Sequence, residues 1–273
     1  MALARADLES LLRARQLDRT LTTIVDARDE MALAPSGIAS LDARLGGGLP
    51  RGHVSEIVGA RSAGRTSLLL CSMAAATARG ELVGLVDALD MFDVESAVAA
   101  GIDLERVLWI RGHVVTSPGF CGDLNQRALE QAIRAFTLVL QAGNFGLVVL
   151  DVAEAPAKAV RRLPFTTWLR LQRMVEGSQT ACLLVGAEPM ARSSAGLTLR
   201  LGGRGLGIGD WGLGGMGNGR VNGGVVNGES PIRFGAVLFD GLTVDARIAR
   251  ARAREREQTD APVRLTTVAA DCA

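Results

Sequence analysis

Hydrophobic and polar positions follow two patterns along the chain: short continuous apolar runs, and longer segments with apolar residues at helical spacing. The runs have the length and the Val, Ile and Leu content of buried strands, and they lie at 54–58, 82–86, 107–110, 147–150 and 182–185. The longer segments predict helices at 66–78, 94–100, 126–142 and 166–176. Strands that alternate with helices predict an α/β fold, in which helices cover both faces of a mostly parallel central sheet.

The first part of the chain departs from this alternation. Residues 3–17 have the pattern of an amphipathic helix, and its apolar face carries Leu8, Leu11 and Leu12. An apolar face without a partner in the same segment is a candidate docking surface. We assign residues 1–32 to this helix and to the linker that follows it.

The predicted core extends over residues 33–250. Its first element is a short helix from Ser36, which is a suitable N-cap, to Leu45. Three consecutive glycines begin at Gly46 and would end this helix, because glycine adopts the left-handed conformation that helix ends require.

The last third of the core changes in composition. Residues 202–228 contain 13 glycines in 27 positions, and such backbone freedom predicts a flexible loop between strands at 197–201 and 234–239. A glycine-rich loop that binds a ligand is the alternative. Another strand at 242–248 would complete an antiparallel C-terminal extension.

Arginine is frequent in the tail, which we assign to residues 251–273 and predict to be disordered. Arg250, Arg252 and Arg254 form a local basic patch at its start, and this patch is a candidate contact for DNA or for a protein partner. A solvated tail without a partner is the alternative.

The overall charge excludes one class of function. The 273 residues carry 30 basic and 29 acidic groups, so the chain is no histone-like polycation and any nucleic-acid contact must be local. The four cysteines are scattered and there are two histidines, which argues against a zinc site. The sequence contains no signal-peptide pattern and no apolar stretch of membrane-spanning length. We therefore expect a cytoplasmic protein that does not enter membranes.

The most specific local pattern lies between the first predicted strand of the sheet and the helix after it. Residues 59–67 match the phosphate loop Gly-x4-Gly-Lys-Ser/Thr at every fixed position except the lysine, which is replaced by Arg65. Backbone N–H groups of such a loop bind phosphate, and Thr66 has the position whose hydroxyl binds Mg²⁺. The cofactor indicated is ATP with Mg²⁺, if this chain binds one. A glycine-rich turn without a nucleotide is the alternative.

A carboxylate further along the chain extends this candidate site. Asp151 follows the apolar run 147–150 and has the position of the aspartate that holds Mg²⁺ in phosphate-loop proteins, although a simple strand-end cap is the alternative. The candidate nucleotide site comprises Gly59, Gly64, Arg65, Thr66, Ser67 and Asp151, with Thr66 and Asp151 as the Mg²⁺ ligands.

Longer strings of residues around the loop resemble the core of the RecA recombinase superfamily. The stretch 46–59 is similar to the family's lead-in to its phosphate loop, 100–108 continues the likeness, and the whole resemblance covers about residues 33–190. Residues 164–173 and 238–242 resemble more narrowly the ImuA-type proteins, RecA-like accessory factors of SOS-inducible translesion synthesis. The resemblance implies a RecA-like fold and a role in DNA repair.

Three positions depart from what the resemblance implies for an active ATPase. Leu89 replaces the family's catalytic glutamate, with Asp87 and Asp90 as the nearby carboxylates, and Ala187 replaces its phosphate-sensing glutamine. Arg65 replaces the lysine, and its wide planar guanidinium is a poor substitute for a compact ammonium group. Phosphoryl transfer depends on positioned charges, so these changes predict a degenerate phosphate loop, and we assign no catalytic residue.

The resemblance also implies a DNA-binding loop after Asp151. Lys158, Arg161 and Arg162 in this segment are candidate contacts for phosphates. The alternative is that the two arginines belong to the solvated start of a helix.

These observations favour a RecA-like protein of DNA repair and damage tolerance, namely a pseudo-ATPase adaptor in SOS-induced error-prone translesion synthesis. The resemblance implies RecA and an ImuB-type inactive Y-family polymerase homologue as partners, with DNA as a further candidate. The alternative is an ATP-binding, DNA-dependent ATPase with recombinase activity. A SulA-like division inhibitor ranks third, because such proteins lack the pattern found at 59–67.

Overall fold

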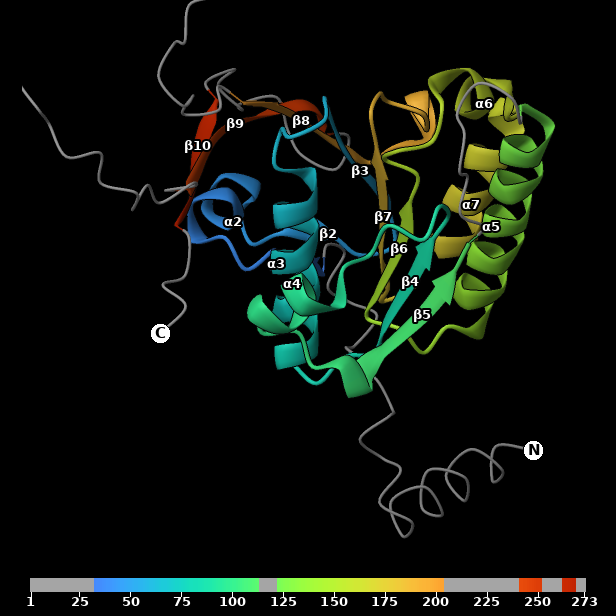
Figure 1. Ribbon diagram of the computed structural model, residues 1–273. Helices are drawn as coiled ribbons and strands as arrows, with labels where there is room; N and C mark the ends of the chain where they lie inside the picture. The colour runs from blue at the N-terminus through green and yellow to red at the C-terminus, as the bar shows by residue number, and fades with distance from the viewer. Residues whose placement is uncertain (1–31, 113–121, 204–240, 252–261, 269–273) are drawn as a thin grey trace, which may run out of the picture.

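A mixed β-sheet organises the residues that the computed structural model describes, which are 32–112, 122–203, 241–251 and 262–268. Its strand order is β10-β9-β8-β3-β7-β6-β4-β5, and the neighbouring strands from β8 to β5 are parallel (Figure 1). The strands of this sheet are β3 (Val54–Gly59), β4 (Val83–Asp87), β5 (Val107–Arg111), β6 (Leu147–Asp151), β7 (Ala181–Gly186), β8 (Leu197–Gly203), β9 (Gly241–Ala251) and β10 (Val263–Val268). Before it, β1 (Leu33–Ala34) and β2 (Leu49–Pro50) form a small antiparallel ribbon.

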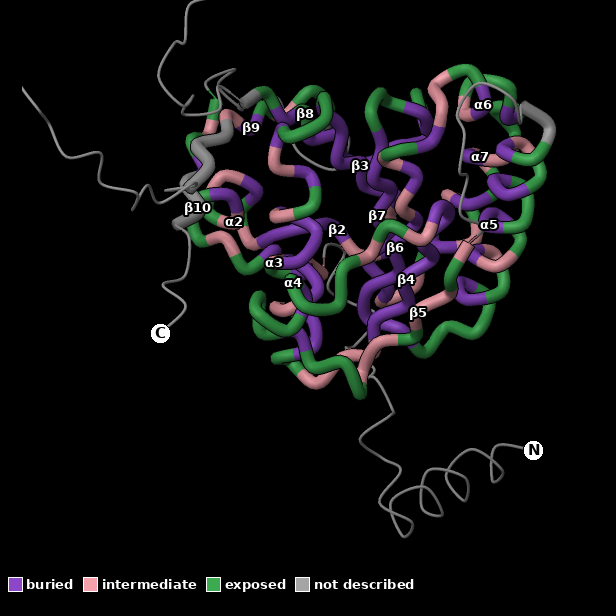
Figure 2. The backbone as a smooth tube through the Cα atoms, viewed as in Figure 1, coloured by how far each residue is buried: buried purple, intermediate pink, exposed green. Residues whose placement is uncertain are grey.

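Helices cover both faces of the sheet. They are α2 (Ala39–Leu45), α3 (Arg65–Ala78), α4 (Val94–Ala99), α5 (Gly122–Ala142), α6 (Ala157–Arg162) and α7 (Phe165–Val175). Along β6, Leu147 and Val149 belong to a hydrophobic cluster with α2, α3 and α4, whereas Val148 and Leu150 belong to another with α5 and α7. The inner strands β4, β6 and β7 are therefore buried on both sides (Figure 2), which explains their continuous apolar runs. None of the helices in the described ranges combines the length and the apolar character needed to cross a bilayer.

The predicted α/β fold with a mostly parallel sheet is confirmed, but the first helix begins later than predicted. It starts at Ala39 because Ser36 lies in a turn before it. The Ser36 N–H donates to Oδ1 of Asp42 at 2.8 Å, and the Ser36 hydroxyl accepts from the N–H of Ile38 at 3.3 Å. Gly46 follows the helix with a φ of 61°, in the left-handed conformation expected at a helix end.

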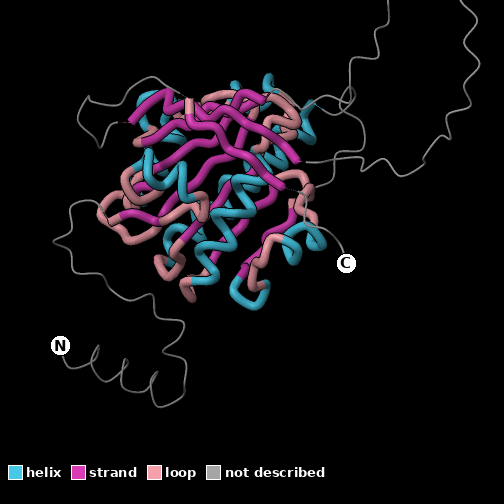
Figure 3. The backbone as a smooth tube through the Cα atoms, turned by 90° about the vertical axis from the view of Figure 1, so that its left-hand side faces the viewer, coloured by secondary structure: helices cyan, strands magenta, loops and turns pink. Residues whose placement is uncertain are grey.

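The edge of the sheet formed by β8, β9 and β10 is antiparallel, and it faces the viewer in Figure 3. β10 lies within 251–273, where the sequence predicted a disordered tail, so the folded part extends beyond residue 250. Val263 and Leu265 explain the difference, because they alternate with polar residues and pack into the hydrophobic cluster on the α2 side of the sheet. Three predicted elements lie outside the described residues: the helix at 3–17, most of the loop at 202–228, and the strand at 234–239.

One arginine joins the amino-terminal ends of several strands. Arg51, between β2 and β3, donates through Nη1 to the carbonyl oxygens of Gly146 at 3.1 Å and Gln179 at 2.7 Å, which precede β6 and β7. Its Nη2 lies 2.6 Å from Oε1 of Glu81, which precedes β4. The guanidinium is largely buried, so this ion pair and its hydrogen bonds are shielded from water.

Candidate functional site

The loop between β3 and α3 turns sharply into the helix. Ser62 and Gly64 have positive φ angles of 61° and 85°, a conformation that glycine adopts freely and that strains serine. The first α-helical hydrogen bond runs from the N–H of Leu68 to the carbonyl of Gly64 at 3.0 Å. The N–H groups of residues 65–67 therefore precede the helical ladder. Backbone donors at a helix N-terminus are the arrangement that binds phosphate.

Gly59, the first residue of this loop, is packed against β8. Its register partner is Leu201, and a Cβ atom at position 59 would lie 2.7 Å from the Leu201 carbonyl oxygen. Such a contact is closer than packed atoms allow, so only glycine fits here without displacing β8. Glycine is needed at position 59 because the backbones of β3 and β8 approach closely there, and not because of a positive φ.

Arg65 is bound to the loop after β6. Its Nη1 donates to the carbonyl of Ala153 at 3.0 Å, and its Nη2 lies 3.0 Å from Oε1 of Glu154. The Arg65 side chain is 6% exposed, whereas Arg61 is exposed and lies 3.8 Å from the same carboxylate. The positive charge of Arg65, which the sequence pattern predicted would face a nucleotide, is therefore balanced by Glu154.

Carboxylates from two neighbouring strands meet beside this loop. Asp87 and Asp151 are register partners at the ends of β4 and β6, and both line a cavity of about 150 Å³ together with Thr66. Burial raises the pKa of Asp151 to about 6, the N–H of Ala153 opposes this, and the charge of Asp87 adds to it. Of the predicted nucleotide-site residues, Thr66 and Asp151 line this cavity; Gly59, Gly64, Arg65 and Ser67 do not.

Neither Leu89 nor Asp90 offers the cavity a free carboxylate. Leu89 lines it with an apolar side chain that is 8% exposed. Asp90 has a φ of 58° and accepts two hydrogen bonds from Arg111, at 2.7 and 2.8 Å. Arg111 also lies over the ring of Trp109, 4.7 Å from its centroid, so this ion pair belongs to a separate surface cluster.

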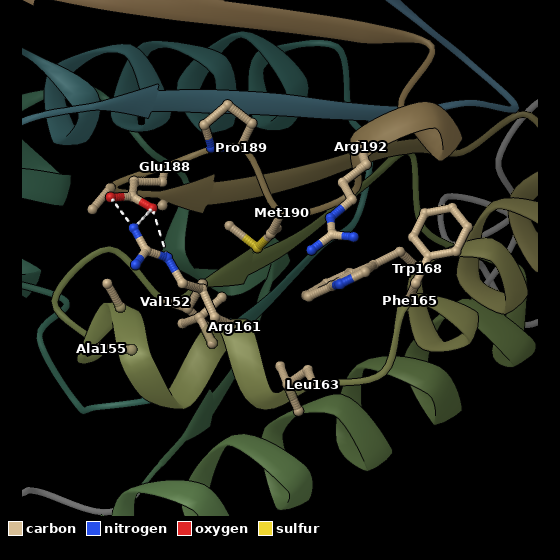
Figure 4. Close-up of a pocket in the computed structure, with 14 residues that line it drawn as sticks. Val152, Ala155, Arg161, Leu163, Phe165, Trp168, Glu188, Pro189, Met190 and Arg192 are labelled. Atoms are coloured by element: carbon tan, nitrogen blue, oxygen red, sulfur yellow. Dashed lines mark hydrogen bonds and ion pairs between the residues drawn. The ribbon is translucent and has the colours of Figure 1, made fainter.

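Of the candidate DNA-contacting residues, Arg161 and Arg162 fall at the end of α6 rather than at a helix start, and Lys158 lies in its first turn. Arg161 forms a two-pronged ion pair with Glu188, with contacts of 2.6 to 3.1 Å (Figure 4). Lys158 and Arg162 are exposed. Arg250 is exposed on β9 and donates to the Arg192 carbonyl. The remaining candidates lie outside the described residues: Arg252, Arg254, Leu8, Leu11 and Leu12.

Sequence reasoning missed a buried carboxylate that fixes the loop after β7. Glu56 is fully buried on β3, and its Oε1 accepts from the N–H groups of Met190 at 2.8 Å and Ala191 at 2.6 Å. Its Oε2 accepts from the hydroxyl of Thr198 at 2.9 Å. The signal was visible, because an acid within an apolar strand must find hydrogen-bond partners when it is buried. Within the described residues, no group of three or more His, Cys, Asp or Glu side chains is placed to hold a metal ion.

Comparison with known proteins identifies the family. The sequence profile of the RecA N-terminal domain matches residues 19–159, which is more than half of the 273-residue chain. The chain belongs to the RecA N-terminal domain family. The strand–loop–helix of 54–78 and the strands β3 to β6 lie within the matched part of this RecA-family chain, whereas β7 to β10 follow it.

Curated relatives of this RecA-family chain are bacterial RecA proteins. Protein RecA of Clavibacter michiganensis is 36% identical over 131 residues, which is 48% of this chain and 32% of the relative. Protein RecA of Mycolicibacterium smegmatis and of Mycobacterium marinum are each 34% identical over 131 residues, which is 48% of this chain and 34% of each relative. The chain thus matches about a third of the length of these relatives.

Proposed function

We propose that this chain is a RecA-like protein of DNA repair and damage tolerance that has lost ATP hydrolysis. It acts as an ImuA-type adaptor in SOS-induced error-prone translesion synthesis. Membership of the RecA N-terminal domain family supports the DNA-repair part of this proposal. The observation that carries the loss of hydrolysis is the binding of Arg65 to Ala153 and Glu154.

The contacts of Arg65 within the chain leave its guanidinium few N–H groups with which to bind a nucleotide. In phosphate-loop NTPases the residue at this position is a lysine whose ammonium group lies against the β- and γ-phosphates. Arg65 instead donates to one carbonyl and pairs with the carboxylate of Glu154, and a phosphate would have to break that charge-assisted bond. Leu89 contributes a methyl-lined wall to the adjacent cavity, where hydrolysis needs a group that positions water.

Binding of ATP with Mg²⁺ remains part of the proposal. The N–H groups at the start of α3 fit a phosphate, and the hydroxyl of Thr66 and the carboxylate of Asp151 would hold Mg²⁺. Bound Mg²⁺ neutralises phosphate charge. Glu154, which keeps Arg65 engaged, weakens the site because its negative charge lies beside it.

Calorimetric titration with ATP and Mg²⁺, followed by a turnover assay on the same sample, tests this proposal. We expect weak binding of ATP and no turnover, with or without single-stranded DNA. Glu154→Gln should release Arg65 and strengthen ATP binding by up to about tenfold without creating turnover. Glu95→Gln, at an exposed position on α4, is the matched control and should change neither quantity.

A definite turnover would contradict the loss of hydrolysis. Turnover on the order of one per minute or faster, abolished by Thr66→Ala and Asp151→Ala together, identifies a working ATPase. That outcome would support the alternative, a DNA-dependent ATPase with recombinase activity. The observation that favours the alternative is that Thr66, Asp87 and Asp151 line one cavity beside the loop. Strand-exchange assays distinguish the two functions.

The proposed partners are RecA, an ImuB-type inactive Y-family polymerase homologue, and DNA. The candidate protein-docking surface is the predicted helix with Leu8, Leu11 and Leu12. Pull-down of each purified partner by the full chain and by a chain without residues 1–20 tests this surface. Equal recovery by both chains would exclude the helix.

A further inference from the structure

A small apolar pocket opens between α6, α7 and the segment that follows β7. Trp168 and Met190 are buried in it, and Leu163 and Val152 complete its apolar wall (Figure 4). Phe165, which is 36% exposed, lies at its rim. The pocket lies across β6 and β7 from α3, so it is separate from the cavity lined by Thr66 and Asp151.

The wall formed by Met190 is held in place. Glu56 accepts hydrogen bonds from the N–H groups of Met190 and Ala191, and this carboxylate is itself fully buried. The next residue, Arg192, has a φ of 47°, which is an uncommon and strained conformation for arginine. A segment fixed by a buried carboxylate, with a strained residue at the pocket mouth, is a preorganised binding surface.

The size of the pocket limits what it can take. Its volume is about 60 Å³, well below the roughly 150 Å³ of a cavity that holds benzene. A nucleobase is larger than benzene and needs a flat aromatic platform, whereas Trp168 lies within the wall and is 3% exposed. An aliphatic side chain of the size of valine or leucine fits the volume and the apolar lining.

The charged residues at the mouth of the pocket indicate which chemical group of a ligand would lie next to the inserted aliphatic side chain. Arg161 is neutralised by Glu188, so that pair contributes no net charge. Arg192 extends from the other side of Met190, and its guanidinium has no hydrogen bond or ion pair within the described part of the chain (Figure 4). Arg192 is therefore the one cation without a partner among the described residues that line the pocket, and a single positive group matches one carboxylate better than a phosphate backbone, which binds through several cations.

We propose that the Trp168 pocket is a docking site for a partner protein segment that inserts one aliphatic side chain beside Met190 and pairs an adjacent Asp or Glu with Arg192. An apolar pocket with Trp and Met, rimmed by arginine, has the composition of the energetic centre of protein interfaces. This inference rests on the proposed adaptor function, because an adaptor needs a surface that recognises a second protein.

Selection from a display library of random linear peptides on the full chain tests the proposal. We expect peptides that carry Leu, Ile or Val with Asp or Glu within a few residues. Synthetic copies should bind Arg192→Glu at least about tenfold more weakly. Selection repeated on Arg192→Glu should return Lys or Arg beside the aliphatic residue. Phe165→Ala should weaken binding of the original peptides, and Arg170→Glu, exposed on α7 outside the pocket, is the matched control.

Three results would overturn the proposal. The first is that selection yields no peptides enriched in an aliphatic residue next to an acid. The second is that Arg192→Glu and Arg170→Glu have equal effects. The third is displacement of the peptides by an oligothymidylate that no longer binds Arg192→Glu, which would make the pocket a nucleic-acid site. ATP turnover by the same preparations is measured separately, so failure of the pseudo-ATPase proposal is distinguishable from failure of the docking site.

Discussion

Asp87 and Asp151 occupy paired register positions on β4 and β6, so two carboxylates meet at the carboxyl-terminal end of the sheet. Asp87 accepts the N–H of Phe92 at 2.7 Å, and Asp151 accepts that of Ala153 at 2.8 Å. Each hydrogen bond satisfies one oxygen, but burial and the neighbouring charge still oppose ionisation of Asp151. The pair therefore makes the stability of the fold depend on pH.

The substitution Asp151→Asn should stabilise the protein at neutral pH. The pKa of Asp151 in the folded chain, about 6, lies above the ordinary value of 3.8, so protonation favours the fold. This contribution is complete below about pH 4 and is lost as the pH rises through 6. The asparagine side chain does not ionise, so the variant does not lose this stability as the pH rises. Its free energy of unfolding should therefore exceed that of the wild type by about 3 kcal/mol above pH 7.

Urea unfolding of both proteins from pH 4 to 8 measures this difference. Asp245→Asn is the control, because Asp245 is 44% exposed and pairs with Arg264 across 3.7 Å at the surface. Its difference from the wild type should be small at every pH. An Asp151→Asn difference that does not change with pH would contradict the assignment of the buried charge.

Glu56 should be a major determinant of stability. Glu56→Ala leaves the buried N–H groups of Met190 and Ala191 without an acceptor, which costs roughly 3 kcal/mol or more in free energy of unfolding. Glu56→Gln retains one acceptor and should cost about 1–2 kcal/mol. Hydrogen exchange of the amides of residues 190 and 191 should accelerate in both variants. Thr198→Val removes only the hydrogen bond from its hydroxyl to Glu56, so exchange of these two amides should change little in that variant. If exchange is unchanged in Glu56→Ala as well, the assigned role of Glu56 is contradicted.

Asp90 should titrate as a surface ion pair rather than as a site residue. Hydrogen bonds from Arg111 hold the pKa of Asp90 below its usual value. NMR titration should find this lowered pKa in the wild type and an increase in Arg111→Gln. Asp93 is an internal control, because hydrogen bonds from Ser96, not from Arg111, hold its pKa low. A parallel change at both residues would argue against the assignment.

Gly59→Ala should destabilise the fold far more than Gly202→Ala. A Cβ atom at position 59 meets the Leu201 carbonyl at 2.7 Å, which predicts a cost of about 1–3 kcal/mol from displacement of β8. At position 202 a Cβ atom meets nothing within 4 Å, so alanine there should be neutral or slightly stabilising. Urea unfolding compares the free energy of unfolding of the two variants. Equal losses of stability would contradict the prediction, because they would mean that β8 moves away from position 59 without a measurable penalty.

The order of strands and helices was predictable because most of the signal is local. β6 and β7 are buried on both faces, so each position of Leu147–Leu150 and Cys182–Val185 is apolar. β10 was not predicted, because its apolar residues alternate with polar ones over a short length beside an arginine-rich segment. The start of α2 was misplaced, because the Ser36 hydroxyl that suggested an N-cap serves a turn instead.

The candidate site was predictable in its residue types but not in its contacts. The pattern at 59–67 indicates a phosphate loop, but the partner of Arg65 is 89 residues away in the sequence and no local rule connects them. The pocket at Trp168 is assembled from α6, α7 and the chain after β7, so its apolar residues look like ordinary core positions in the sequence. Such sites emerge only when the register of the sheet is known.

The contacts of Arg51 have a consequence for substitutions elsewhere in this chain. One guanidinium fastens the starts of β4, β6 and β7, while the phosphate loop, Leu89 and Ala187 lie at or beyond the opposite ends of their strands. Substitutions at that opposite end leave the fastened end intact, so the architecture tolerates changes of chemistry there. Replacements at that end alter the chemistry beside the loop, while the hydrogen bonds that hold the strands in register at the other end persist.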